Sequence, residues 1–130
     1  MDISINEKKE TRLSVLDDCV DIKIVSAASS LESFAIVLEG EKGLLFEAGT
    51  EASQAIVLVK VVDNSSLPAL SEAVCTVDWS WIEGSAIQAY AEAGPGVSMA
   101  LDRVGPLTVS AAFHEGKPFL SFQPFKPAKK

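Results

Sequence analysis

Histidine and cysteine are scarce in this sequence, so the chain has few of the side chains that catalytic and metal sites use. Among 130 residues there are one histidine, His114, and two cysteines, Cys19 and Cys75. Zinc takes four protein ligands, or three and a water, so these side chains make no plausible zinc set. His114 stands before Glu115-Gly116, where we expect a surface turn rather than a catalytic triad. We predict no catalytic residue, no metal site and no cofactor.

Two short motifs resemble cofactor-binding patterns but lack the context that such patterns need. Asp17-Asp18-Cys19-Val20-Asp21 has the spacing with which helical folds hold Mg²⁺ and a diphosphate, yet it precedes a predicted strand, so we expect solvated carboxylates. Gly94-Pro95-Gly96 begins like a dinucleotide fingerprint, but Met99 takes the place of its third glycine. Too few residues follow for the helix and parallel strands of a dinucleotide fold, so we expect a tight turn.

Long apolar runs are also missing. The longest ones, residues 34–38 and 55–59, are far shorter than the ~20 residues of a membrane-spanning helix. Residues 1–12 are polar and charged, so they lack the apolar stretch of a signal peptide. We therefore predict no membrane segment and a cytoplasmic location, where Cys19 and Cys75 are expected to be reduced and buried.

Basic residues are few, and the 18 acidic and 11 basic side chains leave a net charge of −7. A chain this acidic is a poor candidate for nucleic-acid binding, because phosphates have to be neutralised by a basic face. With 48% hydrophobic residues and a mean hydropathy of +0.25, the chain is also too apolar to be a disordered acidic segment. The whole excess lies between residues 43 and 116, where nine acidic residues accompany two basic ones, Lys60 and Arg103.

What the sequence does contain is a regular alternation of apolar and polar residues, interrupted by turn-forming residues at short intervals. Residues 97–102 and 107–114 show it most clearly, with apolar side chains at every second position. This period of two is typical of half-buried strands. By the same criterion, and by content of Val and Ile, strands are expected at residues 20–27, 43–47, 55–62, 74–81, 86–93, 97–102, 107–114 and 118–124.

These strands predict a mainly β fold, an antiparallel β-sandwich or barrel with one short helix. Residues 29–39 are ambiguous. Ser29-Ser30-Leu31-Glu32 has the capping-box spacing of a helix start, whereas Phe34, Ile36 and Leu38 alternate as in a strand. A helix there would favour the alternative fold, α+β with a helix packed on an antiparallel sheet.

No repeat, linker or low-complexity region divides the chain, so we expect one domain over residues 13–125. It follows a polar N-terminal segment, residues 1–12, that need not be ordered, and precedes a frayed basic tail, residues 126–130. Within the domain, a further short helix is predicted over residues 66–73, with Ser66 as its cap.

The last predicted strand lies between Pro118 and Pro124, and proline restricts a strand to an edge because it cannot donate to the ladder. Phe119 and Phe125 share one face of this strand, and Phe122 takes the other. A bare hydrophobic edge promotes aggregation, so the edge needs a cover. We predict a homodimer through this strand, slightly ahead of packing under the N-terminal segment.

Trp79 and Trp81 form the most informative pair. On a strand they would share one face with Cys75 and Val77. Such a stripe usually fills a core. The functional alternative is a binding surface that Tyr90 could join, because Trp and Tyr are enriched at interface hot spots. An acidic rim would then select a basic partner, and the acidic residues that would form it are Asp78, Glu83 and Glu92.

The predicted function is therefore a non-catalytic binding or protein-interaction module that uses this acidic, aromatic-bearing face. One alternative is a small β-barrel that carries an apolar ligand in a cavity lined by the tryptophans and by alanines. Those alanines are Ala89, Ala91 and Ala111. A second alternative is a lyase or isomerase that uses paired carboxylates for acid–base work, although no pair stands out in the sequence.

Overall fold

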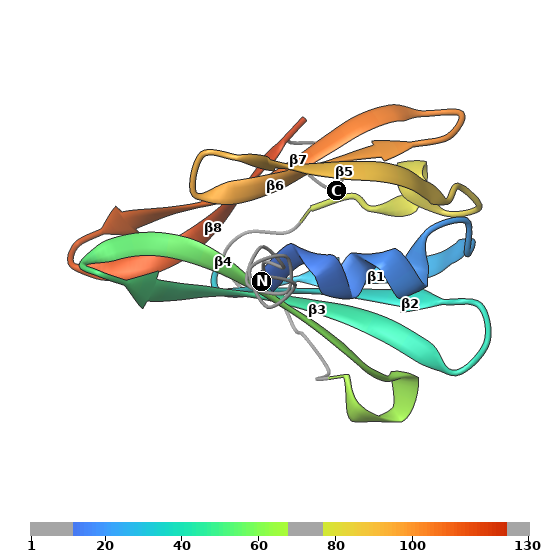
Figure 1. Cartoon of the computed structure of the whole chain (residues 1–130), viewed down its shortest axis with the longest axis horizontal. Helices are drawn as coiled ribbons and strands as arrows, with labels where there is room; N and C mark the ends of the chain where they lie inside the picture. Colours follow the sequence, from blue (N-terminus) through green and yellow to red (C-terminus); the bar gives the residue numbers. More distant parts are fainter. Residues whose placement is uncertain (1–11, 68–76, 125–130) are drawn as a thin grey trace, which may run out of the picture.

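Eight strands form two four-stranded antiparallel sheets that face each other as a sandwich (Figure 1). The computed structural model describes residues 12–67 and 77–124. One sheet contains β1 (Ile24–Ser29), β2 (Ser33–Leu38), β3 (Lys42–Glu51) and β4 (Gln54–Asp63); the other contains β5 (Ile87–Ala93), β6 (Gly96–Leu101), β7 (Gly105–His114) and β8 (Lys117–Gln123). Within each sheet, strands that follow each other in the sequence pair with each other. The predicted antiparallel sandwich is confirmed; the described residues form neither a closed barrel nor an α+β layer.

Three short 3₁₀ helices accompany the strands in the described part of the chain: η1 (Arg12–Cys19), η2 (Asn64–Ser66) and η3 (Ser80–Ile82). Among them, none has the length and apolar character that crossing a bilayer requires. Of the helix predicted over residues 66–73, Ser66 ends η2, and residues 68–73 lie outside the described residues. The helix η1 begins at Arg12, the last residue of the predicted polar segment, and continues into the predicted domain, where no helix was expected at these residues.

The ambiguous residues 29–39 contain β2, and Ser30 explains why the capping-box pattern is misleading. Its Oγ accepts hydrogen bonds from the backbone N–H groups of Glu32 and Ser33, at 3.3 and 3.1 Å. The serine therefore stabilises the turn between β1 and β2 instead of the start of a helix. The strand interpretation is correct, with Phe34 and its alternate neighbours in the core.

The strand predicted over residues 74–81 is wrong for residues 78–81, and residues 74–76 lie outside the described residues. Trp79 precedes η3 with φ −102° and ψ 3°, which is not an extended conformation. The carboxylate of Asp78 accepts hydrogen bonds from the backbone N–H and the hydroxyl of Ser80, at 2.9 and 2.6 Å. Such an Asx turn competes with an extended backbone, so the chain turns at the tryptophans instead of continuing straight.

Alternate residues of the strands fill the space between the two sheets, as the period of two predicts. On β6, Val97 and Met99 are fully buried, and on β7 so are Leu107 and Val109. Phe113 continues this pattern but is 47% exposed. The reason is that Val109 is the last residue of β7 that pairs with β6, so the end of β7 runs on beyond β6 beside β8 alone.

Phe34 lies at the centre of an aromatic cluster that joins the two sheets. Its ring centroid is 4.4 Å from that of Trp79, 5.1 Å from Phe122 and 5.3 Å from Phe46. Trp79 is 4% exposed, and its indole Nε1–H donates to Ser29 Oγ at 3.0 Å, which satisfies the polar atom inside the core. The cluster therefore ties β2 and β3 to β8 and to the segment before η3.

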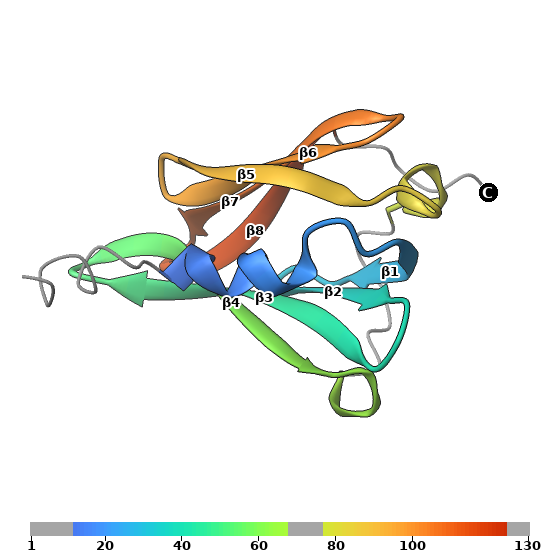
Figure 2. The ribbon, with the colours of Figure 1, turned by 45° about the vertical axis from the view of Figure 1, so that its right-hand side comes forward.

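On the side of β4 and β5, η1 lies along the gap between the sheets (Figure 2). Its residues Leu16 and Cys19 are fully buried. Cys19 is a free thiol in the structure, and burial raises its pKa. The predicted burial of this cysteine is confirmed. Cys75 lies outside the described residues.

β8 is an edge strand, as the flanking prolines predict, and the outer side of β8 is largely occupied. Pro118 has no N–H to donate, and the N–H of Leu120 donates to the carbonyl oxygen of Leu31 at 2.8 Å. Phe122 faces the core, whereas Phe125 lies outside the described residues. This edge offers a second copy few donors, so the homodimer through β8 stays a prediction that the pairing does not favour.

We predict that Phe34→Ala lowers the free energy of unfolding by about 3–5 kcal/mol, because it removes the ring on which the other aromatic side chains pack and leaves a cavity. Phe113→Ala is the matched control. It deletes the same atoms from a half-exposed side chain and should cost less than about 1 kcal/mol. Urea unfolding followed by circular dichroism measures both losses. Equal losses in the two variants would contradict the central place of Phe34.

Candidate functional site

The six residues predicted as one binding face do not form one surface. Trp79 belongs to the core, and Trp81 is half-buried beside it, with ring centroids 6.5 Å apart. Asp78 and Glu83 flank η3 at one end of the sandwich. Glu92 lies near the end of β5, beside the β5–β6 hairpin at the opposite end (Figures 1 and 2).

Tyr90, the sixth of these residues, lies in the middle of β5 and is bound to η1. Its hydroxyl donates a hydrogen bond to Oδ1 of Asp17. This bond, with smaller effects of desolvation and of the negative charge of Asp17, raises the pKa of Tyr90 to about 12. Asp17 thus links η1 to β5 through this hydrogen bond.

Within the described ranges, no group of three or more His, Cys, Asp or Glu side chains is placed to hold a metal ion.

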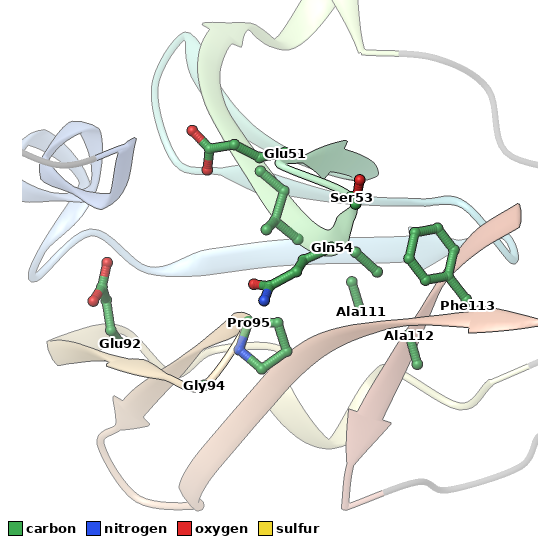
Figure 3. A pocket seen from close by; sticks show the side chains of 11 residues that line it. Glu51, Ser53, Gln54, Glu92, Gly94, Pro95, Ala111, Ala112 and Phe113 are labelled. Atoms are coloured by element: carbon green, nitrogen blue, oxygen red, sulfur yellow. The ribbon is translucent and has the colours of Figure 1, made fainter.

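A cleft of about 640 Å³ lies between the β3–β4 hairpin, the β5–β6 hairpin and the end of β7 (Figure 3). The turn of the first hairpin shapes its rim. Ala52 and Ser53 adopt positive φ angles of 53° and 68°, as the two central residues of a type I′ turn do. This turn pairs Glu51 with Gln54, so both side chains project from the same face of the sheet.

The β5–β6 hairpin is anchored to both sheets. Gly96 approaches β7 so closely that a Cβ atom on it would lie 1.9 Å from the carbonyl oxygen of Val109, so only glycine fits there. The carbonyl oxygen of Pro95 accepts the N–H of Val57 on β4 at 3.0 Å. The tip of this hairpin therefore bridges β4 and β7 and forms one wall of the cleft.

The cleft combines small apolar side chains with an acidic rim. Ala55 and Ala111 are buried small residues that leave space above them. The carboxyl groups of Glu51 and Glu92 lie toward one end of the cleft, and the ring of Phe113 lies toward the other (Figure 3). Among the described residues that line the cleft, none is basic.

The charge of Glu51 has no ion-pair partner within residues 12–67 and 77–124. Lys60, the basic residue of β4, has its Nζ 3.4 Å from Oε1 of Glu47 and so is already paired. His114 is exposed at the β7–β8 turn, with Nε2 4.0 Å from the carboxylate of Glu115. This is the surface turn expected from the sequence. The described lining of the cleft thus contains two carboxylates, Glu51 and Glu92, and no basic side chain.

No pattern in the sequence indicated that Glu51, Gln54 and Phe113 belong to one site. The predicted strands ended at residue 47 and began again at residue 55, so Glu51 and Gln54 fell in a loop. In the structure the strands extend to these residues and leave a two-residue turn. Alternating runs separated by two residues are a hairpin signal, and applying that rule here would have placed the two side chains together.

We predict that the absorbance titration of Tyr90, which is the sole tyrosine, has a midpoint near pH 12 in the folded protein. The substitution Asp17→Ala should lower the pKa of Tyr90 toward the ordinary value of about 10, whereas Asp18→Ala should leave the pKa of Tyr90 raised. Because the folded-state pKa is raised, the bond stabilises the fold below pH ~10, and this contribution is lost as the pH rises through about 12.

Circular dichroism at each pH confirms that the folded state is being titrated. A midpoint near the ordinary value of about 10 in the folded wild-type protein would contradict the hydrogen bond between Tyr90 and Asp17. Equal midpoints in the Asp17→Ala and Asp18→Ala variants would do the same, because only Asp17 accepts that bond.

The cleft offers a ligand negative charge, apolar contact area and the backbone of a strand end. A cationic side chain with an apolar stem matches the first two of these features. No protein-family model, no curated protein and no solved structure matches this chain.

Proposed function

We propose that this protein is a non-catalytic interaction module that binds a basic segment of a partner protein. The observation that supports this function is the cleft of about 640 Å³, in which carboxylates border small apolar residues and no described lining residue is basic. The proposed site keeps Glu92 of the face predicted from sequence and adds Glu51, Gln54 and Phe113. The cytoplasmic location expected from the sequence is part of the same proposal.

Lysine and arginine side chains suit this cleft. Their alkyl stems pack on apolar surface while their charged heads stay near water, so a stem would lie on Ala55 and Ala111 with its head beside Glu51. The side chain of Gln54 points into the cleft (Figure 3) and supplies both a donor and an acceptor to a peptide backbone. Complementary charge speeds the encounter and disfavours acidic partners.

The apolar-carrier alternative depended on a barrel with an internal cavity. The described strands form an open sandwich, and the aromatic cluster around Phe34 occupies the space between the sheets. Ala89 and Ala91, which were expected to line the cavity, are exposed on β5. We therefore favour the interaction module. The carboxylate lyase or isomerase stays a prediction without a particular pair of residues to support it.

A peptide of alternating lysine and valine, acetylated and amidated at its ends, serves as the probe. A peptide of alternating glutamate and valine serves as its control. We predict that the purified protein binds the lysine peptide at low salt and does not bind the glutamate peptide. Binding should weaken as salt rises to about 0.15 M, because screening shortens the reach of the carboxylates. Isothermal titration calorimetry measures these affinities.

Glu51→Gln tests the site itself. It should weaken binding about two- to fivefold, the range expected for one partly exposed ion pair. Glu39→Gln is the matched control, since it removes the same charge from an exposed position on the β2–β3 turn at the other end of the sandwich. Equal binding by the two variants would overturn the proposal, and so would the absence of binding to the lysine peptide at low salt.

A further inference from the structure

The end of β7 has an unpaired edge that borders the cleft. β7 pairs with β6 as far as Val109 and with β8 as far as His114. Residues 110–114, which we call the β7 overhang, therefore have one neighbouring strand instead of two. Three of them, Ala111, Ala112 and Phe113, line the cleft opposite the tip of the β5–β6 hairpin.

The register of the β7–β8 hairpin shows which backbone groups of the β7 overhang are available. A two-residue turn joins His114 to Lys117, and the residues that close such a turn form a hydrogen-bonded pair. Bonded and non-bonded pairs alternate along the ladder, so Ala111 and Phe113 direct their N–H and C=O groups away from β8. Pro118 stands opposite Phe113 and has no N–H, which agrees with this register.

The other sheet edges are covered to a greater extent in the part of the chain that the structure describes. The helix η1 lies along β4 and β5. At the start of β1, Ile24 donates to Ser85 and accepts from Gly84, both at 2.8 Å. On β8, Leu120 donates to Leu31. Because an open strand edge is a template for another extended chain, the β7 overhang is the place where a strand can be added.

We propose that the basic segment of the partner binds as an extended strand added to the β7 overhang, beside Ala111 and Phe113. This inference rests on the proposed function and specifies the binding mode. The added strand gains backbone hydrogen bonds on the β7 overhang, and every second side chain of it points into the cleft. There Glu51 selects lysine or arginine, and the ring of Phe113 offers apolar contact.

A second copy of this chain is the competing occupant of the same edge. Pairing of two β7 overhangs would bring Glu51 and Glu92 of both copies close together, and like charges at an interface are unfavourable. The acidic rim therefore opposes pairing between copies and favours a strand that carries lysine or arginine at alternate positions.

Two methylated forms of the lysine–valine peptide test the backbone pairing. One carries a methyl group on every valine nitrogen, and the other carries one on every lysine nitrogen. Only alternate N–H groups of an added strand face β7. Whether these are the N–H groups of the lysines or of the valines depends on which side chains enter the cleft. One methylated peptide should therefore lose binding by about tenfold or more, while the other stays within about twofold of the parent peptide.

In the protein, the variants Phe113→Pro and Phe113→Ala separate the contribution of the backbone N–H to binding from that of the side chain. Both variants lose the ring, but only proline also removes the N–H that faces away from β8, and strand edges tolerate proline. Phe113→Pro should bind the parent peptide about three- to tenfold more weakly than Phe113→Ala. In the unchanged protein, NMR hydrogen exchange at the Phe113 amide should be fast when free and slow with the peptide bound.

The outcomes are distinguishable. If binding depends on Glu51 but both methylated peptides bind equally and Phe113 exchange is unchanged, strand addition is overturned and the proposed function stands. If the parent peptide does not bind at low salt, the proposed function itself is overturned. If the Phe113 amide becomes protected at high protein concentration without peptide, the edge belongs to a second copy, which also overturns the inference.

Discussion

The stacking of Trp79 on Phe34 is the contact on which the arrangement of the two sheets depends. The sheets share no strand, so side-chain packing and a few backbone hydrogen bonds hold them together. Phe34 comes from the first sheet, Phe122 from the second and Trp79 from the segment between them, with ring centroids 4.4 to 5.1 Å apart. Three separate segments meet here, so this cluster sets the spacing of the sheets. Trp79 is consequently unavailable to a partner.

A difference in side-chain size explains why the cleft lies among the hairpins. Ala55 and Ala111 occupy buried positions there, whereas large aliphatic side chains and the rings of the aromatic cluster around Phe34 fill the core elsewhere. An alanine side chain buries far less surface than an aromatic one, so the space between the strands is less completely filled at the hairpins. Backbone bonds such as that from Val57 to Pro95 keep the walls in place without large side chains.

Much of the fold could be predicted from the sequence, because alternation and burial are properties of single strands, as Met99 and Leu107 illustrate. The conformation of the segment around Trp79 could not be predicted in this way. Asp78 accepts a hydrogen bond from Ser80, and this local turn prevails over the alternation of apolar and polar residues. The cleft was also beyond prediction as a whole. The cleft is formed by three segments that are distant in the sequence. It also depends on the register in which β7 extends beyond β6, and the sequence of one strand does not determine this register.

In the proposed binding mode, the net charge of −7 has a specific role at the β7 overhang. The acidic excess is not one surface, since Glu83 and Glu92 lie at opposite ends of the sandwich. Proteins protect strand edges against pairing with other chains, and here β8 is protected by Pro118 and by the bond of Leu120 to Leu31. The β7 overhang is instead bordered by carboxylates, which repel further copies of an acidic chain and attract a basic one. Charge therefore allows this edge to remain open, whereas an uncharged edge would have to be closed.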